Sequence, residues 1–201
     1  MTISLILVII ALIIAYGVFC YLERKETKAR EALGNCELNV ERVTTADKQY
    51  MFNHFGIAYK MYETCILLKD YMDEECDGAI SEVSNIFQAV REDGISADVC
   101  VVLATHTAED ATYEAKQGFW VEDFPLNDEI VRYSYKEAFS KMMASNYPKP
   151  HSRNCVLRKP IGPKPCNPQY VFGNIQAQLW VDAVTGEVRT SNPAFSEDSE
   201  K

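Results

Sequence analysis

The sequence lacks the short motifs that mark the commonest catalytic and nucleotide-binding sites. It has no glycine-rich phosphate loop, no G-x-S-x-G nucleophile turn and no H-E-x-x-H zinc motif. Basic residues are in the minority, because 20 Lys and Arg face 29 Asp and Glu and leave a formal net charge of −9. Nucleic-acid binding needs a basic stripe that neutralises phosphates. The composition therefore argues against a nucleic-acid partner.

The seven cysteines include no C-x-x-C pair, so a zinc ribbon has no support. In a reducing cytoplasm most of them would act as small buried hydrophobic residues. In an oxidising compartment they would suggest disulfides, and Cys155 with Cys166, across a proline-rich loop, is then the best candidate pair. Both readings of the cysteines stay open, and we favour the reduced one.

One apolar run decides the expected location of the chain. Residues 3–22 carry no charge and match the roughly 20 apolar residues that a helix needs to cross a bilayer. The basic residues Arg24, Lys25, Lys28 and Arg30 follow the run, whereas a cleavable signal peptide has its basic region in front and ends at small residues. We therefore expect a retained anchor. The positive-inside rule places the basic flank and the rest of the chain in the cytoplasm.

Hydrophobic periodicity predicts two early helices after the anchor. Thr44 and Asp47 have the spacing of a capping box, and apolar residues then recur at three- and four-residue steps from Met51 to Cys65. Residues 79–91 repeat the pattern, with these residues on one side: Ile80, Val83, Phe87 and Val90. We expect both apolar stripes to pack within their own domain rather than to form a dimer seam.

The later part of the chain predicts several strands and one more helix. Residues 98–105 form a short β-branched apolar run that is typical of a strand buried on both faces. A helix is expected to begin at Pro125, with acidic residues in its first turn, and to end before Pro148. Two further strands are expected at residues 154–161 and 170–182, followed by a turn at Thr185 and Gly186, while residues 108–117 fit either a strand or a short helix.

Three stretches of the last third occur in a recognisable order. They are CVLRKPI (155–161), GNIQAQLWVD (173–182) and NPAFSED (192–198). Together they resemble the closing segment of a GAF domain. The matching positions are Leu157, Pro160, Ile161, Leu179, Val181, Asp182, Pro193, Ala194, Phe195, Glu197 and Asp198. Lys159 departs from the pattern, because the family usually has an apolar residue there.

The resemblance implies an α/β (α+β) fold in which the N-terminal transmembrane helix precedes a GAF/PAS-like domain, with a central antiparallel sheet flanked by helices. It also implies a ligand pocket on the sheet face away from the early helices, beneath the middle helix and its loops. In this sequence that pocket would draw on Val101, Leu103, Thr105, Phe119, Trp120, Phe124, Tyr133 and Cys155. The Asn-Lys…Phe…Asp-Glu signature of nucleotide-binding members is not found, so no cofactor is expected.

The expected organisation has four segments. Residues 1–22 form the transmembrane anchor, residues 23–43 a basic juxtamembrane helix and linker, residues 44–195 the GAF-like domain and residues 196–201 a polar tail.

The aromatic residues of one loop and the three histidines are further candidates for a binding site, and each also has a simpler structural interpretation. The aromatic residues Phe119, Trp120 and Phe124 could line a small-molecule pocket, but we favour a role in the core. The three histidines are expected to be structural and to bind no metal, although His106, at the end of a strand, could contact a ligand or a haem. His54 is interpreted as a packing residue.

The function that we expect is a membrane-tethered, non-catalytic sensory or interaction module. Its partners would be the bilayer, through residues 3–22, a protein partner or a second copy, and a small ligand. The enzymatic alternative is a thiol-dependent reductase, since one branch with the GAF fold reduces methionine sulfoxide with loop cysteines. Positive charge at His151 and Arg153 would then activate Cys155, or Cys166 would act from an exposed loop. The third reading is an extracytoplasmic, disulfide-bonded domain.

Overall fold

The first described helix, α2 (Val40–Phe55), begins at an asparagine cap. The computed structural model describes residues 38–92, 97–127 and 129–195. Asn39 accepts a hydrogen bond on its side-chain oxygen from the backbone N–H of Arg42 at 2.8 Å. At the other end Gly56 has φ 59° and its N–H bonds to the Phe52 carbonyl, so the chain leaves the helix there.

Three expectations about this part of the chain differ from the structure. The capping box expected at Thr44 and Asp47 lies inside α2, because Asn39 already caps the helix. The domain start expected at residue 44 also falls within α2, and the compact unit begins at Leu38. The stripe expected to reach Cys65 as one helix stops at Phe55, since the turn at Gly56 leads into a strand.

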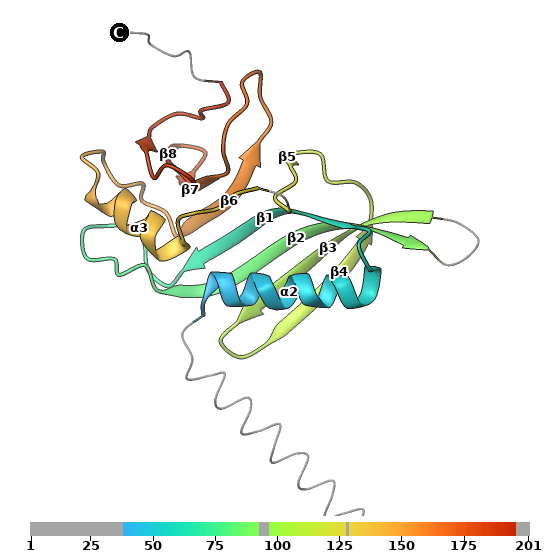
Figure 1. The fold of residues 1–201 in the computed structure, drawn as a ribbon. Helices are drawn as coiled ribbons and strands as arrows, with labels where there is room; N and C mark the ends of the chain where they lie inside the picture. The colour runs from blue at the N-terminus through green and yellow to red at the C-terminus, as the bar shows by residue number, and fades with distance from the viewer. Residues whose placement is uncertain (1–37, 93–96, 128, 196–201) are drawn as a thin grey trace, which may run out of the picture. The chain divides into compact units, whose positions relative to one another are not determined.

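Nine strands form one antiparallel sheet in the order β4-β3-β2-β1-β6-β7-β8-β9, and β5 pairs with β6 off this path (Figure 1). The strands are β1 (Tyr59–Leu68), β2 (Ile80–Glu92), β3 (Ala97–Thr107), β4 (Ala111–Gln117), β5 (Asp123–Phe124), β6 (Asn154–Pro160), β7 (Gln169–Asn174), β8 (Ala177–Asp182) and β9 (Val188–Arg189). Two meanders, β1–β4 and β6–β9, are thus joined along the β1–β6 pair.

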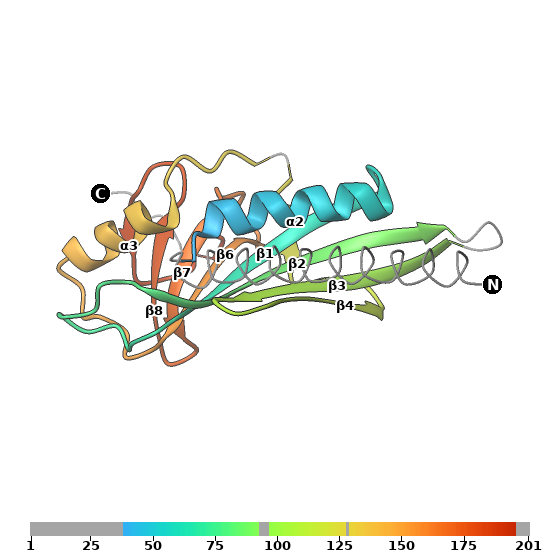
Figure 2. The same cartoon turned by 90° about the horizontal axis from the view of Figure 1, so that it is seen from below.

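Both described helices lie on the same face of this sheet (Figure 2). The second, α3 (Tyr135–Ala144), starts with a capping box between Ser134 and Glu137. The core forms between the helices and the sheet, where large side chains are almost fully buried: Met51, Phe87, Tyr135, Met142 and Phe172. A mostly antiparallel sheet with two helices confirms the expected α+β class.

The structure corrects the second expected helix, because residues 80–92 form the long strand β2. Val83 and Phe87 are both fully buried and face the helices, which an alternating strand allows at a spacing of four. Ile86 is also largely buried, on the opposite face. Apolar residues on both faces of one strand therefore produced a pattern that resembles a helical stripe.

The structure also alters the expected bounds or burial of one later helix and two later strands. Of the helix expected between Pro125 and Pro148, only Tyr135–Ala144 is helical, and the described residues before it are largely irregular. The strand expected over residues 170–182 is a hairpin, β7 and β8. The strand expected over residues 98–105 is confirmed as part of β3, but it is not buried on both faces, since Val102 and Ala104 are buried while Val101 and Leu103 are partly exposed.

The strand expected over residues 154–161 is confirmed as β6, and residues 111–117 of the ambiguous segment form the strand β4.

No helix in the described parts of the chain is long and apolar enough to cross a membrane. The expected anchor, its basic flank as far as residue 37 and the polar tail lie outside those parts.

Candidate functional site

A cleft of about 430 Å³ lies between the N-terminal half of α2, the sheet and the segment that leads into α3. This volume lies within the range of roughly 300–1,000 Å³ that is typical of small-molecule sites. Its apolar lining comes from α2, β1, β6, β7 and the segment before α3: Val40, Met61, Leu126, Leu157 and Tyr170. The cleft thus has a size and an apolar surface that suit a small ligand.

Main-chain hydrogen bonds fix the segment over the cleft at both of its ends. The Leu126 N–H donates to the Met61 carbonyl of β1 at 2.7 Å, and the Met61 N–H donates to the side chain of Asn127. At the other end the N–H groups of Arg132 and Tyr133 both donate to the Ala183 carbonyl, which follows β8, at 2.8 and 3.0 Å. The wall of the cleft is therefore tied to both meanders of the sheet.

The helical wall of the cleft is polar. Glu41, Thr44, Thr45 and Lys48 line it at a spacing that places them on one face of α2. The Thr44 hydroxyl lies 3.3 Å from the side-chain oxygen of Asn85 on β2. Thr45 instead donates to the carbonyl of Glu41 on its own helix at 2.8 Å. One hydroxyl of this wall is therefore linked to the sheet, and its neighbour is not.

A buried hydrogen-bond network starts at this wall. The hydroxyls of Thr44 and Thr64 both donate to the side-chain oxygen of Asn85, Thr64 at 2.7 Å. The amide nitrogen of Asn85 donates to Asp47 Oδ2 at 2.7 Å. Asp47 is fully buried beneath α2. The cleft is thus connected to a buried carboxylate that holds the helix on the sheet.

The same carboxylate also receives hydrogen bonds from β3 and β4. His106 Nε2 lies 2.7 Å from Asp47 Oδ1, and the Tyr113 hydroxyl donates to the same oxygen at 2.8 Å. The Tyr113 ring stacks on Tyr50 of α2 with centroids 3.8 Å apart. Burial and the hydrogen bond to Asp47 raise the pKa of Tyr113, so its hydroxyl stays protonated and keeps donating.

Lys48 is the cation that the α2 wall contributes to the cleft. Its side chain is half-buried, and burial lowers the pKa of its ammonium group. It forms no hydrogen bond or ion pair with any residue that the structure describes. A half-buried charge without a partner is the feature of this cleft that the fold itself does not explain.

A second buried cluster lies on the other face of the sheet. Arg158 Nε donates to Asp123 Oδ1 at 2.7 Å and lies 3.4 Å from Glu63 Oε1. Burial, and then the hydrogen bond and charge of Asp123, raise the pKa of Glu63 to about 8. Among the described residues, no N–H or hydroxyl donates to Glu63 Oε1 or Asp123 Oδ2 when both carboxyl groups are ionised. We interpret the cluster as a carboxyl pair that shares a proton and ties β5 to β1 and β6.

The structure brings only some of the expected pocket residues together. Ala104 pairs with Asn85, which faces α2, so Leu103, Thr105 and Val101 share the sheet face away from α2, where the pocket was expected. Phe119 and Phe124 are exposed, and Trp120 is half-buried with its backbone N–H donating to the side-chain oxygen of Gln88. Cys155 faces the core, and Tyr133 alone of the set lines the cleft.

The described thiols do not have the properties that the reductase alternative requires. Burial raises the pKa of Cys155 well above its usual value, and burial also raises the pKa of Cys166. The expected activating charges act elsewhere, since Arg153 Nε donates to the Leu68 carbonyl at 2.8 Å and His151 stacks on Tyr71. Both cysteines are free thiols in this structure, so it does not contain the disulfide named for an oxidising compartment.

The three histidines lie in separate places. His54 stacks on Tyr50 at the end of α2, His106 bonds to Asp47 and His151 stacks on Tyr71. The described part of the chain contains no group of three or more His, Cys, Asp or Glu side chains that could hold a metal ion.

Sequence reasoning missed the cleft and the network beneath it. The one available signal was the polar face of the first helix, where Thr44, Thr45 and Lys48 follow one another at helical spacing. Asp47, Asn85 and His106 are far apart in the sequence, and they meet only because β2 pairs with β3 and α2 packs on these strands.

Comparison with models of known families, with curated proteins and with solved structures finds no match for this chain or its fold. The resemblance to GAF domains therefore stays a prediction from the sequence.

Proposed function

We propose that this protein is a membrane-tethered, non-catalytic sensory module that binds a small ligand in the cleft beside α2. The observation that carries the proposal is the network beneath the cleft. Thr44 and Thr64 donate to Asn85, and Asn85 donates to the buried carboxylate of Asp47. A ligand that bonds to either hydroxyl changes the contacts that hold α2, the first described element after the expected anchor.

The chemistry of the cleft supports binding rather than catalysis. Its threonine hydroxyls donate to the oxygen of an amide or a main-chain carbonyl, neither of which activates a nucleophile. His106 points to Asp47 and is not among the residues that line the cleft. The thiols that the enzymatic alternative requires have raised pKa values.

The proposal keeps the remaining expectations from the sequence. Residues 3–22 hold the protein in the bilayer, with the domain in the cytoplasm, and the domain belongs to the GAF/PAS-like group. The α+β fold, with its mostly antiparallel sheet, is compatible with that assignment. In this proposal the signal passes from α2 to a protein partner or to a second copy of the chain.

A binding screen tests the cleft directly. The full chain in lipid nanodiscs is screened against a library of fluorinated fragments by ¹⁹F NMR, with empty nanodiscs as the blank. Thr45→Trp fills the cleft without removing a bond to the sheet, because Thr45 bonds only within α2. Ala46→Trp is the matched control on the exposed side of the same helix.

We expect fragments that bind the wild-type chain and the Ala46→Trp variant and that lose at least tenfold in affinity with Thr45→Trp. Unfolding curves of both variants confirm that the fold is kept. Fragments that bind all three chains equally, or a library without any binder, would show that the cleft is not a ligand site.

A further inference from the structure

The acidic side chains that line the cleft already have partners within the fold. Glu41 accepts a hydrogen bond from the backbone N–H of Tyr135 at 2.9 Å. Glu137 accepts from the backbone N–H and from the hydroxyl of Ser134, at 2.8 Å each. Glu129 forms an ion pair with Lys159. Two of these contacts hold the start of α3, and the third holds the segment before it. These carboxylates are therefore engaged in building the walls of the cleft.

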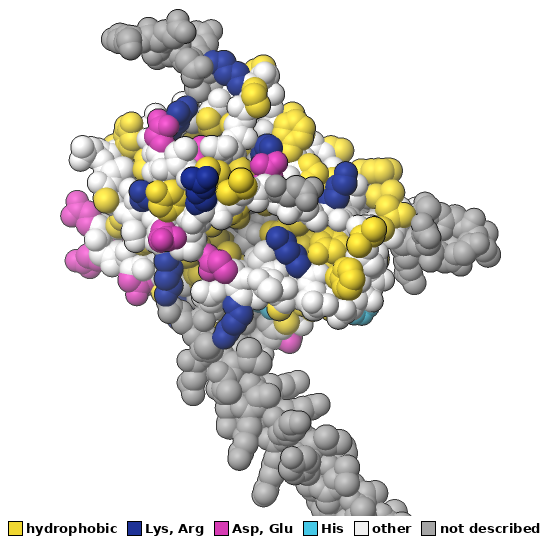
Figure 3. Space-filling model, in the orientation of Figure 1, with side chains coloured by type: hydrophobic (Ala, Val, Ile, Leu, Met, Phe, Trp, Pro, Cys, Tyr) yellow, Lys and Arg dark blue, Asp and Glu magenta, His cyan; other side chains and the backbone are white. Residues whose placement is uncertain are grey.

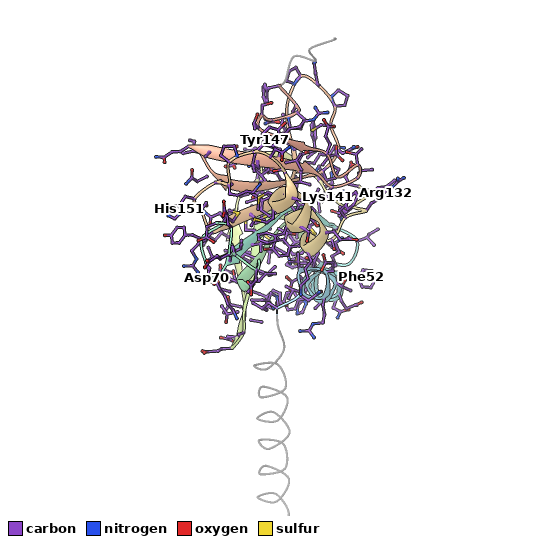
Figure 4. The ribbon with its side chains drawn as sticks, turned by 90° about the vertical axis from the view of Figure 1, so that its left-hand side faces the viewer. Phe52, Asp70, Arg132, Lys141, Tyr147 and His151 are labelled. Atoms are coloured by element: carbon purple, nitrogen blue, oxygen red, sulfur yellow. The ribbon has the colours of Figure 1, made fainter. Side chains whose placement is uncertain are left out.

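The cations that line the cleft are in the opposite situation. Lys48 is half-buried and has no partner among the described residues, and the lowered pKa of its ammonium group reflects that uncompensated burial. Arg132, on the segment before α3, extends away from the ribbon in Figure 4. Its guanidinium likewise forms no hydrogen bond or ion pair with the part of the chain that the structure describes.

The arrangement along α2 separates the acidic end of the cleft from Lys48. Glu41 lies beside the start of α3, and Lys48 follows seven residues later, about 10 Å along the helix axis. The apolar side chains of Met61, Leu126 and Leu157 line the same cleft. A ligand with an apolar body and one charged end matches this distribution.

The surface around the cleft has a matching pattern of charge. Figure 3 shows Lys and Arg side chains spaced among hydrophobic ones across the centre of this face. Acidic side chains lie singly among them, and a further group gathers at the left edge of the view, over the connection between β1 and β2. That connection contains the exposed acidic residues Asp73, Glu74, Glu75 and Asp77.

We infer that the ligand of this cleft is a small carboxylate with an apolar body, and that Lys48 binds its carboxylate group. The inference rests on the proposed function, because it names the class of ligand for the same cleft. A bound carboxylate supplies the counter-charge that the fold does not give to Lys48, and it stabilises the charged form of the ammonium group.

Matched acids and amides test the inference on the full chain in nanodiscs of neutral phosphatidylcholine. The pairs are 4-phenylbutyrate with 4-phenylbutyramide and hexanoate with hexanamide, which differ in charge but hardly in shape. The variants are Lys48→Met, which removes the charge, Lys48→Arg, which keeps it, and Lys69→Met, which removes an exposed lysine outside the cleft.

We expect the acids to bind the wild-type chain at least tenfold more tightly than the amides. Lys48→Met should abolish this preference, while Lys48→Arg and Lys69→Met should keep it. As an independent readout, NMR of ¹³C-dimethylated lysines should show the pKa of Lys48 rising when the acid is added and staying constant with the amide.

Two failures can be told apart. If acids and amides bind equally, or if Lys48→Met weakens both alike, the carboxylate inference is overturned and the cleft remains a ligand site. If no member of either pair binds and the fluorinated library also fails, the proposed function fails with it. Unfolding curves show that each variant is folded before its binding is measured.

Discussion

Glu63 is a carboxyl group in an environment that disfavours its charged form. Its carboxyl group lies buried beside Asp123 and Arg158, and burial followed by the interaction with Asp123 raises its pKa to about 8. In the unfolded chain a glutamate ionises near a pKa of about 4.3. Between these two values the folded state binds more protons than the unfolded state. The contribution of Glu63 to the free energy of unfolding therefore falls as the pH rises from about 4 towards 8.

The substitution Glu63→Gln removes this titration and keeps a side chain of the same size that can donate to Asp123. We expect the variant to gain stability relative to wild type as the pH rises. The gain between pH 5.5 and pH 8.5 should be at least about 1.4 kcal/mol, the equivalent of one pKa unit. Urea unfolding at both pH values measures it.

Glu74→Gln is the control for the Glu63 variant, because Glu74 is exposed in the connection between β1 and β2. It should change stability equally at both pH values. If the free energies of unfolding of wild type and Glu63→Gln differ by the same amount at both pH values, Glu63 is already ionised in the folded protein at pH 5.5.

At the scale of elements, α2 is held on the sheet by apolar packing and by one polar anchor. Asp47 accepts hydrogen bonds from His106, Tyr113 and Asn85, which belong to three different strands. Apolar contacts alone leave a helix free to slide, whereas these bonds fix one position. The anchor thus connects the strand β4, at the edge of the sheet, to the helix that lines the cleft.

The substitution Tyr113→Phe tests this anchor with the least change in packing. It removes the hydroxyl that donates to Asp47 and keeps the ring that stacks on Tyr50. A hydrogen bond to a charged group is worth about 1.5–3 kcal/mol, and we expect the free energy of unfolding to fall by that amount. Backbone amides in the middle of α2 should also exchange faster with deuterium.

Tyr71→Phe is the matched control, because Tyr71 also stacks on a ring, that of His151, but is half-exposed and lies outside the network. It should leave both stability and hydrogen exchange nearly unchanged. If both tyrosine variants behave alike, the hydroxyl of Tyr113 does not stabilise the position of α2.

The sequence predicted element types well where one face of an element is buried, and poorly elsewhere. The strand β6 and the apolar face of α3, with Tyr135, Ala138 and Met142, follow simple patterns and were predicted. The strand β2 was mistaken for a helix because it carries buried side chains on both faces. The spacing of apolar residues alone cannot distinguish a strand that is buried on both faces from an amphipathic helix.

The cleft could not be predicted from local pattern because it depends on which distant elements meet. Thr64 and Asn85 are opposite each other only through the register of β1 and β2. Lys48 looks like any solvent-facing lysine until the segment around Leu126 is placed beside it. The resemblance drew attention to the late aromatic residues instead, and Phe119 and Phe124 proved to be exposed.

At the scale of the whole molecule, the chain divides into two units. One is residues 1–37, and the other, from Leu38 onwards, contains the sheet, both described helices and the whole described core. The expected membrane anchor belongs to the first unit and the cleft to the second. A sensor built in this way needs the second unit to be in the compartment where its ligand is found.

The expected cytoplasmic location of the second unit can be tested with one introduced thiol. Ile175 lies in the turn between β7 and β8 and is 96% exposed, so Ile175→Cys offers a reactive site without disturbing the core. Because the basic residues after residue 22 favour the cytoplasmic side, we expect a membrane-impermeant maleimide to label this variant only after the cells are permeabilised. The wild-type chain, whose described cysteines are buried or partly buried, gives the background. Labelling of Ile175→Cys in intact cells above that background would place the domain outside and reverse the topology.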